Sequence, residues 1–302
     1  MGAILGPIAM ALVTIVTPAI VAAQSSPASP LQAELRATFV RQVESAAARL
    51  DGVAGWIVTD LTTRDVITAR HERQPFPTAS TIKLSILYEL LEQAESGTIA
   101  LDRPVVLDRT RVVGGSGVLQ HLTTPALSLR DYAALMIILS DNTATNVVID
   151  AVGMGRVTER MASLGLSDIR LRRKMMDAAA VARGDENIAS PASLAAMAER
   201  LWQGDGLSDA SRAMAHDILR QVSGQVRSAV PGSVRVFSKT GSLSGVRAEA
   251  AVVDVAGRPF SIAVMTTYLA RDEDGNTLIH DIASAAHRYF DRIARGGAHG
   301  RR

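Results

Sequence analysis

The chain has 302 residues, of which 47% are hydrophobic and only 4% aromatic, and its formal net charge is +2. This length allows one large domain or two interleaved ones, with a core of aliphatic side chains, and so small a net charge gives no electrostatic basis for binding nucleic acid. The chain has no cysteine, which excludes disulfides and thiol chemistry.

The first 23 residues have the pattern of a secretory signal peptide. Ala3–Ile20 is an uncharged apolar run, and the small residues of Val21–Ala23 suit cleavage before Gln24. Because no Lys or Arg precedes the run and its length approaches a membrane span, a retained membrane anchor is the alternative. In both cases we expect the rest of the chain to be secreted or periplasmic. Residues 24–30, rich in Ser and Pro, are interpreted as a linker.

The segment after this linker predicts a helix and a β-hairpin. From Leu31 to Leu50, apolar side chains recur at helical spacing with charges between them, which is typical of an amphipathic helix. Val53–Thr59 and Asp65–Ala69 are strand-like, and the polar residues Thr62–Arg64 join them.

Helices dominate the next part of the chain. An apolar helix carries Ser80 and Lys83 and is predicted to end at Gly97. Ser128 is a predicted N-cap, because Asp131 three residues later can complement the free amides of the first turn.

The second half of the helical part contains a long irregular segment. Gly153 and Gly165 bracket a short predicted helix. Residues 167–189 have poor periodicity and many charges, so we predict a long loop. Ser190 as N-cap and Pro191 at the first helical position then begin another helix.

The last third returns to strands and closes with a helix. The strands are predicted at Val234–Thr240, Ala248–Val255 and Phe260–Tyr268, and the helix at Asn276–Ala294. Strands joined by tight turns favour an antiparallel sheet. The sheet part would therefore come from both ends of the chain, about 31–79 and 225–295, with a helical part inserted between them at about 80–224.

Ser80-Thr81-Ile82-Lys83 places a hydroxyl and an amine on one helix face about one turn apart. A serine hydroxyl is a poor nucleophile until a neighbouring base takes its proton. A lysine is such a base only when burial and nearby charge lower its pKa. The pattern therefore predicts a nucleophile, Ser80, with its base, Lys83, built in.

Two later tripeptides extend this pattern. Ser140-Asp141-Asn142 follows the helix that begins near Ser128, and Lys239-Thr240-Gly241 is predicted at the end of a strand. Ser-x-x-Lys, Ser-Asp-Asn and Lys-Thr-Gly in this order are the signature of class A β-lactamases and penicillin-binding proteins, which this chain resembles over roughly residues 31–293. Singly, each motif also fits an ordinary cap, turn or strand exit. Together, they favour the functional interpretation.

The resemblance implies an α/β fold of the α+β type, in which an antiparallel five-stranded sheet flanked by helices carries an inserted all-helical domain. It implies that Ser80 is the nucleophile and Lys83 its proton acceptor. Ser140 would pass a proton to the leaving nitrogen, and Lys239 would lower the pKa of Lys83 and attract a substrate carboxylate. The backbone amides of Ser80 and Ser242 would form the oxyanion hole.

The same resemblance assigns substrate contacts near the third motif. Thr240 and Ser242 would offer hydroxyls to the substrate carboxylate, and Gly241 would let the ligand approach the strand edge closely. Asn142 would donate to a substrate amide. Arg247 is a second candidate for the carboxylate, with an ordinary surface arginine as the alternative.

We expect no metal and no cofactor. The histidines show no spacing typical of a metal site or a Ser–His pair (His71, His121, His216, His280, His287 and His299). The chain also lacks a Gly-rich phosphate loop. The expected partners are a β-lactam or a peptidoglycan stem peptide, bound by a monomer that does not bind nucleic acid.

The chain departs from the family pattern in the long loop. Class A β-lactamases carry there, two residues after an arginine, a glutamate that activates the deacylating water. If Arg173 matches that arginine, Met175 takes the place of the glutamate, and a methionine cannot act as a base. Asp177 and Glu186 are carboxylates that follow in this loop, and we expect Asp177 to pair with Arg172 or Arg173 as a structural salt bridge.

Three functions remain open at this point. The first is a class A-type serine β-lactamase whose deacylation is slow or unusual. The second is a penicillin-binding D,D-peptidase that acts on stem peptides ending in D-Ala-D-Ala. The third is a sensor that stays acylated, which is the weakest because no transmembrane signalling module accompanies it.

Overall fold

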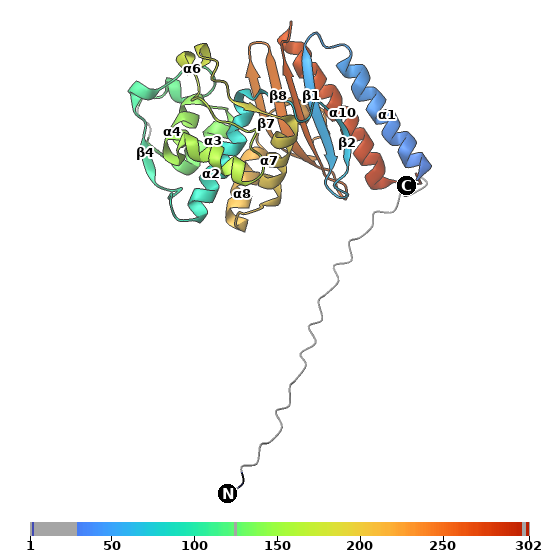
Figure 1. The fold of residues 1–302 in the computed structure, drawn as a ribbon, viewed down its shortest axis with the longest axis horizontal. Helices are drawn as coiled ribbons and strands as arrows, with labels where there is room; N and C mark the ends of the chain where they lie inside the picture. The colour runs from blue at the N-terminus through green and yellow to red at the C-terminus, as the bar shows by residue number, and fades with distance from the viewer. Residues whose placement is uncertain (1, 3–28, 124–125, 298–299, 302) are drawn as a thin grey trace.

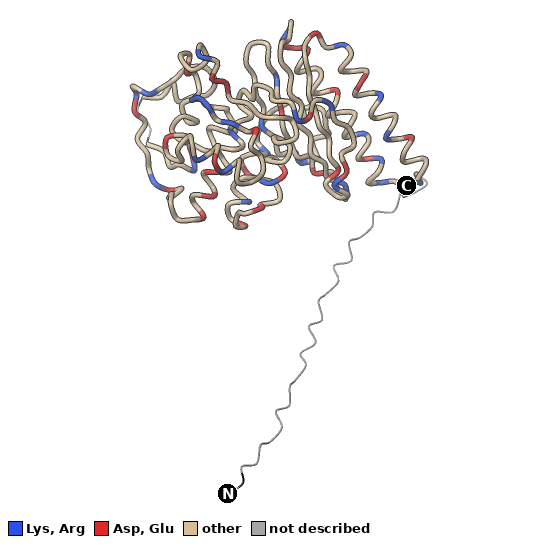
Figure 2. The backbone as a smooth tube through the Cα atoms, in the orientation of Figure 1, with Lys and Arg blue, Asp and Glu red and all other residues tan. Residues whose placement is uncertain are grey.

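The computed structural model describes residue 2 and residues 29–123, 126–297 and 300–301. The predicted signal peptide, apart from Gly2, and most of the linker lie outside these residues. In the described part, no helix is both long and apolar enough to cross a membrane. Basic and acidic residues are interspersed along the described chain (Figure 2).

The described chain forms three layers (Figure 1). The central layer is a sheet built from β1 (Val53–Asp60), β2 (Val66–Arg70), β7 (Arg235–Leu243), β8 (Val246–Asp254) and β9 (Phe260–Thr267). One outer layer consists of the two terminal helices, α1 (Pro30–Ala47) and α10 (Asp272–Arg295). These two helices lie side by side on the right of the sheet in Figure 1.

The other layer contains the helices of the inserted part. They are α2 (Lys83–Glu95), α3 (Leu129–Ile138), α4 (Asn142–Val152), α5 (Met154–Ser163), α6 (Ala178–Ala182), α7 (Pro191–Gln203), α8 (Asp209–Leu219) and α9 (Gln225–Ser228). Short 3-10 turns precede and follow them: η1 (Ala79–Ile82), η2 (Arg109–Arg111) and η3 (Leu119–His121). Two small strand pairs complete the layer, β3 (Phe76–Pro77) with β6 (Ile188–Ala189) and β4 (Pro104–Val106) with β5 (Ala126–Ser128).

The sheet has five strands in the order β2-β1-β9-β8-β7, and every neighbouring pair is antiparallel. The predicted antiparallel five-stranded sheet, assembled from both ends of the chain, is therefore confirmed. β7 is the last strand in this order, so one side of its backbone is not paired within the sheet. The turn that begins the helical layer, η1, packs against this open edge.

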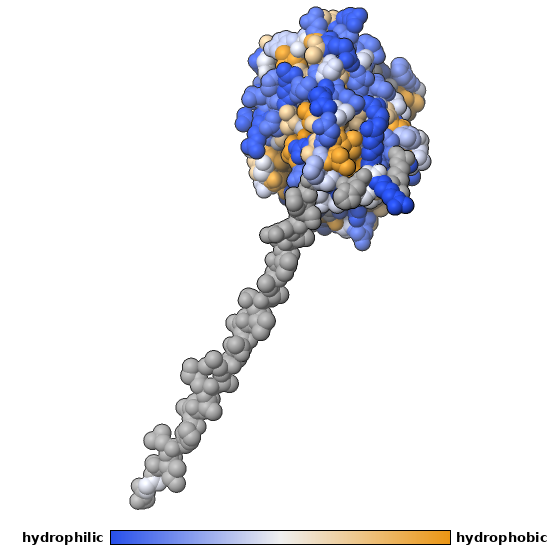
Figure 3. Space-filling view, turned by 90° about the vertical axis from the view of Figure 1, so that its right-hand side faces the viewer, coloured by the Kyte–Doolittle hydropathy of each residue, from blue (hydrophilic) through white to orange (hydrophobic). Residues whose placement is uncertain are grey.

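The two faces of the sheet bury two different hydrophobic clusters, because side chains alternate along each strand. On β7, Phe237 belongs to the cluster shared with the helical layer, whereas Val236 belongs to the cluster beneath α1 and α10. The outer surface on the α1 and α10 side is mainly hydrophilic, with a small apolar area between the helices (Figure 3). Lys239 lies two residues after Phe237 on β7, so its side chain also faces the helical layer.

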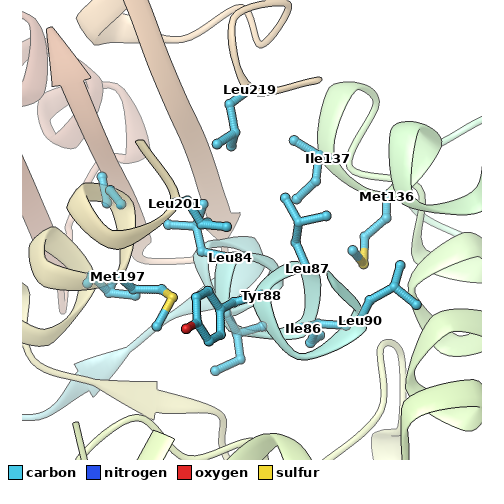
Figure 4. Packing of buried hydrophobic residues seen from close by; sticks show 14 of the residues in the cluster. Leu84, Ile86, Leu87, Tyr88, Leu90, Met136, Ile137, Met197, Leu201 and Leu219 are labelled. Atoms are coloured by element: carbon cyan, nitrogen blue, oxygen red, sulfur yellow. The ribbon is translucent and has the colours of Figure 1, made fainter. Parts of the chain in front are cut away.

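α2 is the central helix of the inserted part, and its side chains are buried on almost every side. In Figure 4, Leu84, Leu87 and Leu90 point outward from it toward residues of α3, α7 and α8. Ten of its thirteen residues are buried, among them Lys83. A helix hydrophobic all round is one that other helices enclose, and this enclosure fixes the position of the Ser80–Lys83 segment.

Two of the predicted helix starts are confirmed. Ser128 accepts a hydrogen bond from the Asp131 amide, and the Asp131 carboxylate accepts one from the Ser128 amide, which is a complete capping box. Ser190 likewise accepts a hydrogen bond from the Ser193 amide and precedes Pro191 at the first position of α7.

Two expectations about local structure are corrected. The segment 167–189 is not a loop throughout, because it contains α6 and the strand β6, which pairs with β3. The alanines of Ala178–Ala182 favour a helical turn that the charges on either side obscured. Lys239-Thr240-Gly241 lies inside β7 rather than at its end, because pairing with β8 continues through Leu243.

Ser128→Ala removes the side-chain half of the capping box. We expect the free energy of unfolding to fall by about 1 kcal/mol, which is typical for the loss of a serine N-cap. Urea denaturation followed by circular dichroism measures it. Ser45→Ala, at an exposed position within α1, is the control. Equal unfolding midpoints for both variants and the parent would contradict a stabilising role for this cap.

Candidate active site

The first component of the site is the turn that carries Ser80. Ser80 lies in η1, directly before α2, and the preceding Ala79 has a φ of 46°, which a non-glycine residue rarely adopts. β7 passes directly beside this turn. A Cβ atom at Gly241 would come within 2.7 Å of the Thr78 carbonyl oxygen and 3.0 Å of the Ser80 amide nitrogen. Only glycine allows the strand edge to approach the Ser80 backbone this closely.

The second component is a hydroxyl held between two lysines. Lys83 Nζ lies 3.1 Å from Ser140 Oγ, and Lys239 Nζ lies 3.2 Å from the same oxygen. Lys83 also donates to the Ser140 carbonyl oxygen at 2.8 Å, and Lys239 to the Thr240 carbonyl oxygen at 2.9 Å. Three segments that are distant in sequence therefore converge on Ser140.

Both lysines are fully buried, and this changes their acid–base chemistry. Burial, reinforced by the positive charge of Lys239 and opposed by the negative charge of Asp141, holds the pKa of Lys83 well below its usual value. Burial lowers the pKa of Lys239 to about 7, against the opposing effect of Glu249. Lowered pKa values are what a lysine needs to accept a proton at neutral pH.

Ser140 is fixed by the turn between α3 and α4. Its φ of 53° is a conformation that non-glycine residues seldom adopt. The next residue, Asp141, caps α4 by accepting from the Ala144 amide and also accepts from the Val118 and Leu119 amides. The Asp141 side chain thus caps α4 locally and ties the turn to the loop opposite.

Asn142 completes the cluster from the first position of α4. Its Oδ1 accepts from Lys83 Nζ at 3.2 Å, and its Nδ2 donates to the Gly114 carbonyl oxygen at 3.1 Å. Its backbone amide donates to Ser116. The amide predicted to bind substrate is therefore already engaged with Lys83 and with the loop that precedes η3.

Ser80 lies beside this cluster, but its hydroxyl is not bonded to it. Within the described residues, no hydrogen bond to Ser80 Oγ is formed, and the bonds of Lys83 Nζ go to Ser140 and Asn142. The structure thus brings Lys83, Ser140, Asn142 and Lys239 into direct contact. Ser80 is placed one turn before Lys83 and against the edge of β7.

The residues predicted to bind a carboxylate lie on the opposite sheet face from Lys239. Thr240 and Ser242 alternate with Lys239 along β7, and Arg247 is paired with Ser242 across the β7–β8 ladder. The Arg247 guanidinium is engaged by an ion pair with Asp272 at 3.0 Å and by hydrogen bonds to two backbone carbonyl oxygens. Thr240 and Ser242 lie on the edge strand β7. The positive charge of Arg247 is already balanced by the Asp272 carboxylate.

The long loop is anchored to α4 at Met175, the residue that the sequence predicts in place of the family's glutamate. Asn146 Oδ1 accepts from the Met175 amide at 2.8 Å, and Asn146 Nδ2 donates to the Met175 carbonyl oxygen at 3.1 Å. Met175 is buried and lines a cavity of about 470 Å³ that none of the catalytic candidates lines. The backbone of residue 175 is therefore fixed from both sides.

The carboxylates of this loop do not take the roles expected. Asp177 forms no salt bridge with Arg172 or Arg173, and instead caps α6 by accepting from the Ala180 amide. Glu186 is the partner of the buried Arg173, with Nη2–Oε1 and Nε–Oε1 distances of 2.7 and 3.1 Å. Both guanidinium nitrogens donate to the same Glu186 oxygen, Oε1, which also accepts from the Asn187 amide.

Sequence reasoning missed Glu249, which is completely buried on β8. Its only sequence signal is a single charge within an otherwise apolar strand, Ala248–Val253. Among the residues described, no group of three or more His, Cys, Asp or Glu side chains is arranged to hold a metal.

Comparison with known proteins identifies the family of the chain. A family model described as "Beta-lactamase enzyme family" matches residues 36–290. β-Lactamase CARB-3 of Pseudomonas aeruginosa is 27% identical over 224 residues, which cover 72% of this chain and 77% of that protein. A β-lactamase structure from Sphaerobacter thermophilus has a TM-score of 0.77 and 31% identity, covering 83% of this chain and 96% of the other.

The structure of PBP-A is equally similar in shape, with a TM-score of 0.77, 25% identity, and coverage of 84% of this chain and 96% of the other. The α+β fold with an antiparallel sheet and an inserted helical part is shared with these structures. The chain belongs to the β-lactamase enzyme family, within the superfamily of class A β-lactamases and penicillin-binding proteins.

Proposed function

We propose that this protein is a serine hydrolase of the class A β-lactamase type, which opens a β-lactam amide by forming an acyl-enzyme on Ser80. The observation that carries the proposal is the Ser140 hydroxyl, held at 3.1 and 3.2 Å from two buried lysine ammonium nitrogens beside the Ser80 turn. The names of CARB-3 and of the Sphaerobacter structure support the reaction class.

Acylation begins with removal of the Ser80 proton by neutral Lys83. Ser80 Oγ then forms a bond to the lactam carbonyl carbon, and the carbonyl oxygen becomes an oxyanion. The backbone amides of Ser80 and Ser242 are the proposed donors to that oxygen, since Gly241 brings the β7 edge against Ser80. As the carbon–nitrogen bond breaks, Ser140 passes its proton to the lactam nitrogen and regains one from Lys83.

Lys239 supplies the positive field for this sequence. When protonated, it keeps Lys83 neutral and stabilises a substrate carboxylate near the edge of β7. Thr240 and Ser242, whose side chains leave the other face of the edge strand, would donate hydroxyl hydrogen bonds to a carboxylate that lies across this edge, and Asn142 would donate to a substrate amide carbonyl after release from Gly114. Arg247 contributes at longer range or after release from Asp272.

Release of the acyl group is the step at which this chain differs from the family pattern. Met175 occupies the position expected for the water-activating glutamate, so we propose slow deacylation. The second candidate function, a D,D-peptidase acting on peptidoglycan stem peptides, is favoured by this same residue. A leucine-to-glutamate variant of PBP-A is known as an acyl-enzyme complex with penicillin G, with a TM-score of 0.76 and 25% identity to this chain.

A sensor that remains acylated is the third and weakest candidate. For each of the three we propose a monomer that takes a β-lactam or stem-peptide substrate and needs no metal or cofactor. We also propose that residues 1–23 are a signal peptide, that 24–30 are a linker, and that residues 31–302 form the exported catalytic domain. A retained N-terminal membrane anchor is the alternative.

Ser80→Ala tests the nucleophile. We expect it to abolish covalent labelling by a fluorescent penicillin, because no other residue of the cluster forms the acyl bond. Lys83→Met, which keeps Ser80, should slow labelling by about 10²–10⁴-fold, the range carried by general-base catalysis. Labelling is followed by gel fluorescence over time. Stoichiometric labelling of Ser80→Ala would refute the assignment of Ser80.

Met175→Glu tests the explanation for slow deacylation. The Asn146 clamp fixes the backbone at this position, so a carboxylate introduced there should activate a water and shorten the lifetime of the acyl-enzyme roughly 10²-fold or more. Time-resolved intact mass spectrometry with a penicillin measures that lifetime. Met175→Gln is the matched control, with similar length but no base.

Equal acyl-enzyme lifetimes for Met175→Glu and Met175→Gln would show that residue 175 does not occupy the position of the base. In the parent protein, an adduct that persists for hours would favour the D,D-peptidase or sensor. Turnover within seconds would favour an efficient β-lactamase.

A further inference from the structure

Glu249 is a buried carboxylate next to the active site with no role in the chemistry described so far. It lies on β8 directly opposite Thr240 of the third motif, and its exposed fraction is 1%. Its Oε2 accepts from the backbone amides of Gln225 and Val226 at 2.8 and 3.2 Å. These two bonds fix the carboxylate behind the strand that carries Lys239.

The other carboxylate oxygen is unsatisfied. In the described structure, neither buried Glu249 Oε1 nor the buried hydroxyl of Ser238 has a hydrogen bond of good geometry, although this hydroxyl is near enough to lower the pKa of Glu249. Space around Oε1 is restricted, because a Cβ atom at Gly224 would lie 2.3 Å from Oε1 and 2.7 Å from Thr240 Cγ2. A buried acceptor without a donor costs free energy, so its retention needs a reason beyond packing.

Lys239 pairs with Ala250, the residue after Glu249, so Lys239 and Glu249 are diagonal neighbours on the β7–β8 ladder, fully buried on opposite faces of the sheet. Burial raises the pKa of Glu249 to about 7, opposed by hydrogen bonds and by the Lys239 charge, and burial lowers that of Lys239 to about 7, opposed by the Glu249 charge. Charges in a low-dielectric interior interact strongly even without direct contact. Each of the two groups therefore favours the charged form of the other.

The remaining charges near Glu249 are engaged elsewhere. Arg247, two residues earlier on β8, is paired with Asp272 of α10. Arg227 of α9 donates its hydrogen bonds to the carbonyl oxygens of Val230, Pro231 and Val234. The elements packed on Glu249 thus leave Lys239 of β7 as the charge with which it couples.

We propose that Glu249 is a positioning residue that acts as the buried counter-charge of Lys239, keeping this lysine protonated for the reaction proposed above. The inference rests on the proposed role of Lys239. Without the negative charge, the Lys239 ammonium would be a buried cation bonded only to neutral oxygens. Loss of its proton would remove the field that keeps Lys83 neutral and that attracts the substrate carboxylate.

Glu249→Gln is the test, because the amide keeps the shape and can still accept from Gln225 and Val226 while losing the charge. The pKa of Lys239 should then fall, so the alkaline limb of the acylation rate with a penicillin should move to lower pH by roughly one unit. Rates at pH 6 should change little. Glu199→Gln, at a carboxylate bonded to Ser261 and Arg64, is the control and should leave the profile unchanged.

A second readout does not depend on activity. The pKa of Glu249 is raised on folding, so its contribution to stability is present below pH 4.5 and is lost as pH rises through about 7. The parent should therefore lose thermal stability relative to Glu249→Gln between pH 4.5 and 7. Glu199→Gln should follow the parent through that range.

An acylation profile of Glu249→Gln that superimposes on that of the parent would overturn the inference while leaving Ser80 as the nucleophile. Absence of acylation in the parent would instead refute the proposed function, and the stability readout would still test the buried carboxylate. If Glu249→Gln does not fold, the glutamate side-chain carbons of the parent are titrated by ¹³C NMR. Titration of every glutamate near pH 4.5 would then overturn the inference.

Discussion

The site depends on one constraint, which is that the Ser140 hydroxyl lies between two lysine ammonium groups buried in the same interior. Two like charges cannot both be retained there without a large electrostatic cost, so at least one lysine must lose its proton near neutral pH. A neutral lysine beside a serine turn is a base. The chemistry proposed for Ser80 follows from that condition.

The composition of the chain fits this requirement. Only three of its 32 basic residues are lysines, and two of them, Lys83 and Lys239, are in this cluster. The third, Lys174, is paired with Asp150. Arginine cannot lose its proton in a protein, so it could not replace a lysine that must act as a base. In the proposed function, Met175 limits the same site, because a methionine cannot activate a water for the second half of the reaction.

Much of the fold could be predicted from the sequence, because its signals are local. Ser128 and Ser190 cap their helices through residues three positions later, and the strands were recognised from their local sequence. The structure contains both caps and the antiparallel sheet. The alanine-rich turn of α6 and the extension of β7 through Leu243 were missed. Flanking charges obscured the first, and the end of the second is set by pairing with the neighbouring strand β8.

The site was predictable as a set of motifs but not as a set of contacts. The motif residues Lys83, Ser140 and Lys239 do converge, yet the engagement of Arg247 by Asp272 and of Arg173 by Glu186 is set by tertiary geometry. Glu249 carried no motif at all. Its importance comes from burial opposite Thr240, which no sequence pattern reports.

The most direct test of this account is the titration of the three lysines by NMR with ¹³C-lysine labelling, with assignment by Lys83→Met and Lys239→Met. The account predicts that the Lys83 and Lys239 signals titrate well below the ordinary lysine value of 10.5, that of Lys239 with a midpoint near 7. If both signals titrate at the ordinary value, the lysines are not in one buried cluster, and the proposed base does not exist.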